Sequence, residues 1–216
     1  MLLAGGIAGA LATGAVVGAG HALEADHVAA VATLVDDETA RPARVGASWG
    51  IGHAIPVVLL GIGLVAVGVQ LPATVTAGVE TLIGLLLIAL GARTLWRRRH
   101  HAGAADHSHL QVGQLSVGAA HTHGFDGESL AVGALHGIAG SGALVVLLVS
   151  TAATVGTALA FLAGFTLLSI GTMAAVSLAW RNAVATGRGL ETLAGLASIA
   201  VGGLLLAEQT GIVLVA

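Results

Sequence analysis

The chain has 216 residues, of which 56% are hydrophobic and 9% charged, and its formal net charge at pH 7 is −3. These proportions are far from those of a soluble domain and predict an integral membrane protein. The chain has no cysteine and no basic arm, which excludes disulfides and thiolate metal ligands and argues against a nucleic-acid partner.

Six apolar stretches are long enough to cross a bilayer, which takes roughly 20 helical residues. We expect these spans near residues 2–35, 44–69, 73–96, 129–150, 152–180 and 184–210. The boundary near residue 150 is inferred mainly from length, because residues 129–179 are too long for a single crossing. The predicted fold class is therefore an all-α integral membrane protein with six transmembrane helices.

The first span carries an unusual polar cluster, GHALEADHV at residues 20–28, which contains His21, Glu24, Asp26 and His27. A straight helix over residues 2–35 would be about 50 Å long, well beyond the bilayer core. On an ideal helix His21 and His27 share a face with Glu24, whereas Asp26 lies about 100° away from His27. We therefore expect either a helix broken at the motif, which we favour, or an aspartate that supports an imidazole without reaching the ion. The alternative is a short first span whose end leaves Asp26 and His27 in solvent.

Two later spans add histidines to this set. The second contains GIGHAIPVV at residues 50–58, with His53, and the fourth contains His136. A set rich in imidazoles suits Ni²⁺, Co²⁺ or Zn²⁺. The predicted metal site is His21, Asp26, His27 and His53, with His136 as a further candidate that could equally act as a hydrogen-bond partner.

An internal duplication is visible in the spans. Residues 78–91, GVETLIGLLLIALG, agree with residues 189–202, GLETLAGLASIAVG, at nine of fourteen positions, and the alignment also pairs His21 with His136 and Gly52 with Gly171. We therefore expect a first three-helix repeat at 1–96, a His-rich loop at 97–128 and a second three-helix repeat at 129–216. Three crossings per unit make the repeats inverted, as in many secondary transporters. Low-complexity apolar sequence could mimic this similarity.

The arginines predict the orientation. All eight basic residues are arginines in or beside the first, third and fifth loops, at positions 41, 44, 93, 97, 98, 99, 181 and 188. By the positive-inside rule this side is cytoplasmic and both termini face outward. The cytoplasmic loop also carries six histidines and Asp106 between His100 and His123, which predicts either a weak metal buffer or a solvated linker.

Two motifs resemble a known family. The His-x4-Asp-His pattern at His21, Asp26 and His27 is similar to the RHAxDADHI signature of the nickel/cobalt transporter family, and GIGHAIPVV resembles that family's SLGHSxVV motif. The resemblance covers mainly residues 15–60 and implies a permease for Ni²⁺ or Co²⁺ in the cell membrane that recognises its ion through these residues. Gly20 and Glu24 depart from the signature, where the family has Arg and Asp. The later family motifs are not matched, which leaves uptake and efflux open.

The leading hypothesis is thus a non-enzymatic secondary transporter whose partners are a divalent metal ion and the lipid bilayer, and which needs no prosthetic group. Efflux through the same site is one alternative. An intramembrane zinc hydrolase is another, because three histidines and an acidic residue can hold zinc and activate water. Glu80 lies inside the third span and could relay protons if transport is coupled to them.

Overall fold

The computed structural model describes residues 6–36, 38–67, 73–101, 126–139, 152, 154–187 and 189–209. Within these ranges the chain forms helices and no strand. The helices are α1 (Gly6–His21), α2 (Ala25–Leu34), α3 (Pro42–Val67), α4 (Ala73–His101), α5 (Gly127–Ala139), α7 (Val155–Thr186) and α8 (Leu190–Gln209). The all-α prediction is confirmed for this part of the chain.

Apolar length identifies the membrane helices. In the described part of the chain, α3, α7 and α8 are each long and apolar enough to cross a membrane, and the bent pair α1 and α2 adds a fourth candidate. The predicted third span lies within α4, and the predicted fourth begins in α5 and continues into residues outside the described ranges. These helices are those of a membrane protein, whereas the count of six crossings stays a prediction.

The first span is broken at the His/Asp motif, as expected. The backbone N–H groups of Leu23 and Glu24 donate to the carbonyls of Gly20 and His21, so α1 closes in tight turns. The chain then restarts as α2 at an angle of 62° to α1. Asp26 lies in the first turn of α2, where its negative charge is favoured by the helix dipole.

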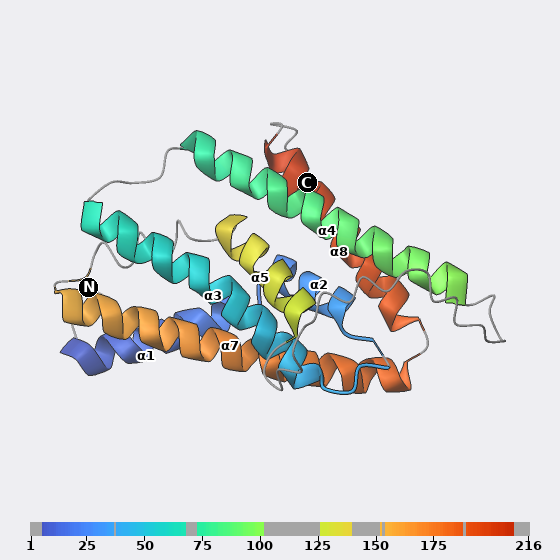
Figure 1. Cartoon of the computed structure of the whole chain (residues 1–216), viewed down its shortest axis with the longest axis horizontal. Coiled ribbons are helices and arrows are strands. Elements are labelled where there is room, and N and C mark those ends of the chain that lie inside the picture. Colours follow the sequence, from blue (N-terminus) through green and yellow to red (C-terminus); the bar gives the residue numbers. More distant parts are fainter. Residues whose placement is uncertain are drawn as a thin grey trace, which may run out of the picture.

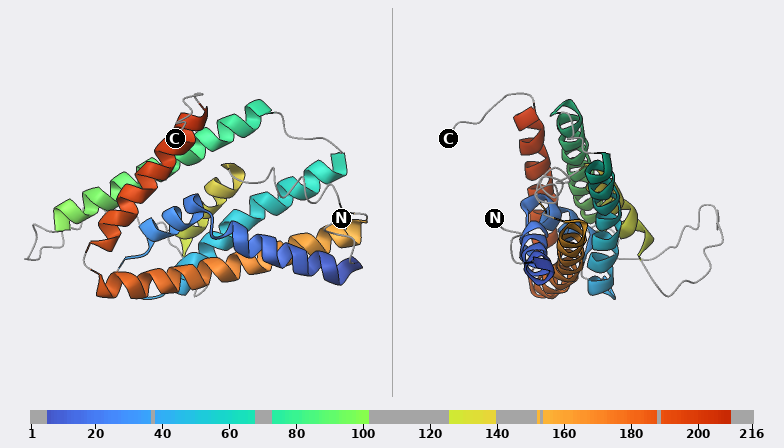
Figure 2. Two further views of the ribbon diagram at one scale, coloured as in Figure 1. Left: turned by 180° about the vertical axis from the view of Figure 1, so that it is seen from behind. Right: turned by 90° about the vertical axis from the view of Figure 1, so that its left-hand side faces the viewer.

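The helices form two groups that enclose the break. α1 packs along α7, and α3 packs against both α7 and α5, whereas α4 packs against α8 (Figure 2). The short helices α2 and α5 lie between the long α3 helix and the α4–α8 pair (Figure 1). α2 contacts α8, α4, α7 and α3, so the motif at its start is surrounded by the rest of the protein.

Glycines let these backbones approach closely. A Cβ added at Gly133 would lie 2.1 Å from the Trp49 carbonyl oxygen, and one at Gly137 would lie 2.3 Å from that of His53. Small residues at such contacts are typical of membrane helices, which associate through packing and backbone proximity. His136 directly precedes Gly137. The close contact between α3 and α5 therefore holds His136 near His53.

Large apolar side chains lie both in the interior and on the surface of the protein. Trp49, Phe161 and Phe165 are fully buried, whereas Ile7, Val16 and other large apolar residues are exposed. Water would disfavour such a surface, but a lipid-facing one needs no polar covering. The four buried histidines instead gather around the break between α1 and α2.

Candidate metal centre

Four buried histidines and one aspartate meet at the broken first span. His21 ends α1, Asp26 and His27 begin α2, and His53 and His136 come from α3 and α5. Each of the four imidazoles is at most 3% exposed. The structure thus brings together all five residues that the sequence predicts as metal-binding.

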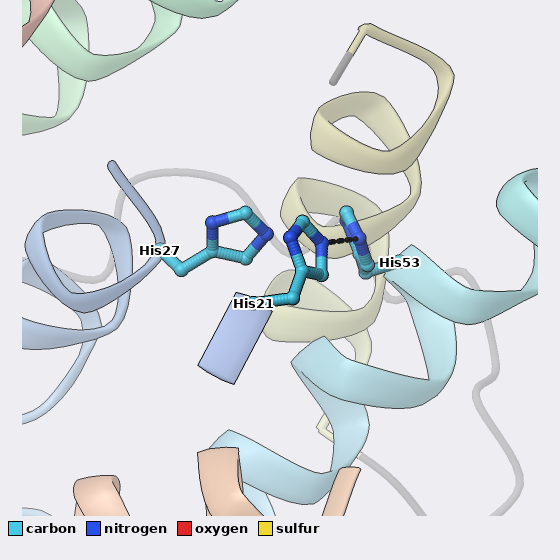
Figure 3. Close-up of side chains that lie close together, drawn as sticks. All are labelled: His21, His27 and His53. Carbon is cyan, nitrogen blue, oxygen red and sulfur yellow. Dashed lines mark hydrogen bonds between the residues drawn. The ribbon is translucent and has the colours of Figure 1, made fainter. Parts of the chain in front are cut away.

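Three imidazoles converge on one point. The Nε2 atoms of His21 and His53 are 3.2 Å apart, and His27 lies beside both rings (Figure 3). Each of the three offers a nitrogen within 4.8 Å of the others. Ligands of a tetrahedral ion with bonds of 2.0–2.1 Å are separated by about 3.3 Å, so the His21–His53 distance matches two nitrogens that share one cation.

Asp26 joins His27 to the fourth imidazole, His136. Its Oδ1 lies 2.9 Å from His27 Nδ1, and its Oδ2 lies 3.0 Å from His136 Nε2. An ionised carboxylate only accepts, so both ring nitrogens donate N–H groups to it. The proton on His27 Nδ1 leaves Nε2 with a lone pair, and this buried Nε2 has no hydrogen-bond partner in the described part of the chain. Such a carboxylate is a typical support for a metal-ligating histidine.

Glu24 places a second carboxylate close to His21. Its Oε2 lies 3.1 Å from His21 Nδ1 and 3.9 Å from His27 Nδ1, and its side chain is 48% exposed. This carboxylate favours a proton on His21 Nδ1, and His21 Nε2 then accepts a hydrogen bond from His53 Nε2.

Asp26, His27 and His136 form a second possible set of ligands, because their nitrogens and carboxylate oxygen also lie within 4.8 Å of one another. In the structure these atoms are already joined by hydrogen bonds, and His27 uses Nδ1 in them. The group of His21, His27 and His53 has one hydrogen bond of its own, between His21 Nε2 and His53 Nε2, while His27 Nε2 makes none within the described residues. We therefore take the three-histidine group as the better candidate for direct ligation.

Two aromatic residues that the sequence analysis did not identify cover the imidazoles. The Trp49 ring stacks on His53 at 5.1 Å with an interplanar angle of 5°, and Phe165 stacks on His21 at 5.2 Å. Trp49 lies four residues before His53 on α3, a spacing that places both on one helix face and could have revealed it. Phe165 comes from α7, far away in sequence, and no local pattern indicates it.

Other predicted polar groups lie away from this centre. Glu80 accepts a hydrogen bond from Gln209, and Glu191 pairs with Arg98 at 3.2 Å. The His-rich loop after His101 lies outside the described residues, so its predicted metal-binding role is untested.

Comparison with known proteins gives one informative similarity. No protein family and no solved structure matches the chain. The sequence is 32% identical over 148 residues to the urease accessory protein UreH from Bacillus sp. (strain TB-90). The aligned part spans 65% of this chain and 62% of the relative, so the chain covers less than two thirds of that protein's length.

Proposed function

We propose that this protein is a secondary transporter that moves Ni²⁺ or Co²⁺ across the cell membrane. The observation that carries the proposal is the buried convergence of His21, His27 and His53, with two Nε2 atoms 3.2 Å apart, in a chain of apolar helices. Ionisable side chains within membrane spans cost free energy, and their presence there usually marks a functional site. Binding of one transported cation by all three imidazoles accounts for their presence at the same place.

In this proposal the five polar residues have different tasks. His21, His27 and His53 replace water molecules around the ion. Asp26 keeps His27 in the correct tautomer and contributes negative charge, and His136 holds the second oxygen of Asp26. The site therefore combines one set of direct ligands with a supporting pair that reaches into α5.

Ligand chemistry supports nickel or cobalt as the substrate. Imidazole nitrogens suit both ions, and the chain has no sulfur ligand from cysteine. Affinity alone would favour Cu²⁺ at any such nitrogen site. Discrimination must therefore come from the geometry that the stacked Trp49 and Phe165 impose on His53 and His21.

The similarity to UreH and the family resemblance of residues 15–60 point in the same direction. UreH is named as a urease accessory protein. We propose that this chain likewise serves an enzyme inside the cell, by supplying it with a metal ion. This assigns uptake as the physiological direction. Export would use the same ligands and differ only in coupling.

We further propose that the chain contains two inverted repeats, with α1–α2, α3 and α4 corresponding to α5, α7 and α8. The helix contacts support this correspondence. When each helix is replaced by its counterpart, the α1–α7 contact becomes the α5–α3 contact, and the α3–α7 and α4–α8 contacts become themselves. The His21–Phe165 stack likewise corresponds to the contact between His136 and Trp49. This pairing of Trp49 with Phe165 differs by about one helical turn from the sequence alignment of Gly52 with Gly171.

The α4–α8 contact follows the same exchange in detail. Residues 111 apart are equivalent in the duplicated sequence. A Cβ at Gly84 would lie 2.8 Å from the Gly202 carbonyl oxygen, and one at Gly195 would lie 3.1 Å from that of Gly91, which are equivalent contacts. Ser198 donates to the Leu87 carbonyl at 2.8 Å, and these two positions are themselves equivalent. Such pairing favours a two-fold relation, around which alternating access is commonly built.

The proposal is tested by radioactive nickel flux into proteoliposomes with an imposed proton gradient. His21→Ala and His27→Ala proteins, reconstituted at matched density, are expected to lose flux because each removes a direct ligand. Thr186→Ala is the control, since Thr186 is exposed at the end of α7 and outside the cluster. Wild-type flux in both site variants would remove the assignment, and lipid hydrolysis by the purified protein would favour a hydrolase instead.

Direction is tested in cells that overproduce the protein. Importing cells become sensitive to nickel, whereas exporting cells become resistant. A resistant phenotype would reverse the proposed direction without changing the site.

A further inference from the structure

A second intramembrane carboxyl lies apart from the metal centre. Glu80 is partly buried on α4, within the predicted third span, and its carboxylate accepts a hydrogen bond from the Gln209 amide of α8. It lies seven residues after the start of α4, about 10 Å along the helix axis. The predicted orientation places this end of α4 on the outer side, opposite the arginines.

The internal duplication gives this pair a counterpart. Glu80 and Glu191 are 111 residues apart, as are Arg98 and Gln209. Glu191 lies 3.2 Å from Arg98 in the structure, so the two acid pairs occupy equivalent places at opposite ends of the α4–α8 contact. The repeats thus keep the acid at both ends but replace the arginine at one end by an amide.

This replacement changes what the acid can do. An arginine partner favours only the ionised carboxylate, because guanidinium donates hydrogen bonds and never accepts them. An amide both donates and accepts, so Gln209 can hydrogen-bond to Glu80 in either protonation state by presenting its N–H₂ or its carbonyl. Of the two equivalent acids, Glu80 is the one whose partner carries no positive charge that opposes protonation.

Neighbouring charges do not replace the missing cation. The titratable and charged groups on the helices packed against α4 are Asp26 and His27 of α2, Glu128 and His136 of α5, and Glu191 and Glu208 of α8. Glu128 pairs with Arg93, and Asp26 joins His27 to His136. Among these groups Glu208, exposed and next to Gln209 in sequence, adds further negative charge rather than a cation.

The pair is mechanically connected to the metal centre. Ile83, three residues after Glu80, belongs to the same buried cluster as Ala30 and Val31 of α2. Ala30 follows His27 by three residues on that helix. Packed side chains therefore join the part of α4 next to Glu80 to the helix that carries Asp26 and His27.

From this arrangement we propose that Glu80, held by Gln209, is the proton-binding site that couples metal transport to the proton gradient. In each cycle one proton binds the carboxylate from the outer side and is released to the cytoplasmic side, and only the carboxyl O–H bond forms and breaks. The inference rests on the proposed transport function for its role, but proton binding by Glu80 can be measured without any metal.

The first experiment is therefore independent of transport. A hydrophobic carbodiimide modifies protonated carboxyl groups in apolar surroundings, and mass spectrometry of the purified full-length protein locates the label. We expect labelling at Glu80 that decreases as the pH is raised, and none at Glu191. Gln209→Arg should abolish the labelling, because it recreates the Arg98–Glu191 type of pair. An unlabelled Glu80 at acidic pH, or equal labelling in Gln209→Arg, would overturn the proposal.

The second experiment measures coupling with radioactive nickel in proteoliposomes. Glu80→Gln is expected to retain metal exchange between equal nickel concentrations, within about twofold of the parent, and to lose accumulation driven by a pH gradient. Glu191→Gln is the matched control and should keep both activities. If the wild-type protein exchanged no nickel, the transport function would be rejected. If it exchanged nickel but did not accumulate it under a pH gradient, only the coupling role of Glu80 would be rejected. Loss of exchange in Glu80→Gln would also overturn it, by showing that the residue is structural.

Discussion

At the residue scale, the candidate site depends on which atoms of each imidazole are already engaged. Asp26 accepts from His27 Nδ1 and His136 Nε2, and Glu24 lies 3.1 Å from His21 Nδ1. With a proton on Nδ1, His27 Nε2 keeps its lone pair, and His21 Nε2 faces His53 Nε2 at 3.2 Å. The carboxylates thus determine ligand direction without having to bind the ion themselves.

Sequence could indicate this set of residues but not their division of labour. His21 and His27 fall on one face of an ideal helix, and their grouping followed from spacing alone. Asp26 did not fit that face, because the actual helix restarts just before it and its carboxylate turns to the neighbouring ring. Whether His136 binds the ion or a hydrogen-bond partner was undecidable from sequence, since its neighbour Asp26 is 110 residues away.

Asp26→Asn should weaken nickel binding without abolishing it. The amide oxygen can still accept from His27, but the negative charge is lost and the amide N–H₂ meets the donor of His136. Loss of such a supporting carboxylate typically costs about 10–100-fold in metal affinity. Equilibrium dialysis of the purified protein measures the effect. Asp36→Asn, the same change at the far end of the α2 segment, is the control, and equal affinities in the two variants would contradict the assigned role.

At the element scale, the broken first span is the feature that the sequence predicted best. Its excess length and its central polar motif both favoured an interruption, and α1 and α2 meet at 62° where the motif lies. The partners of these helices were less accessible. Nothing in the periodicity of α1 showed that it would pack along α7, because nearly every residue of both helices is apolar or small.

Close approach of α5 to α3 makes Gly137 a sensitive position. A methyl group there would lie 2.3 Å from the His53 carbonyl oxygen and must push the two helices apart. We expect Gly137→Ala to destabilise the protein by about 1–3 kcal/mol, as overpacking does, and to weaken nickel binding by moving His136 from Asp26. Thermal unfolding and nickel titration in detergent measure both effects.

Gly171→Ala provides the matched control for this substitution. Gly171 is also within a long helix, but a Cβ at that position would meet nothing within 4 Å. It should leave stability and binding close to those of the parent protein. If both alanine variants behaved alike, the close α3–α5 contact would not position the site.

At the scale of the whole molecule, charge asymmetry predicts how the protein lies in the membrane. On α4, Arg93, Arg97 and Arg98 each pair with an acid from a different segment, namely Glu128, Asp36 and Glu191. Positive residues thus gather at one end of the helices, together with three of their acidic partners. The sequence could predict this side from the arginines alone, whereas the pairing required the fold.

Single cysteines on α7 test the predicted orientation, because the natural chain contains none. Val155 and Thr186 are exposed residues at opposite ends of this helix. In intact cells a membrane-impermeant maleimide should label Val155→Cys, whereas Thr186→Cys should react only after the membrane is permeabilised. The reverse pattern would place the arginine-rich side outside the cell and invert the assigned topology.

The interruption between α1 and α2 also has a consequence for biogenesis. Irregular backbone is tolerated at membrane depth only where protein or a wet cavity surrounds it. The ribosome makes residues 22–24 early, but α7, which packs along α1, is made more than a hundred residues later. This segment therefore leaves the ribosome well before the helix that shields it from lipid, and a nascent chain truncated before α7 should remain a substrate for membrane proteases.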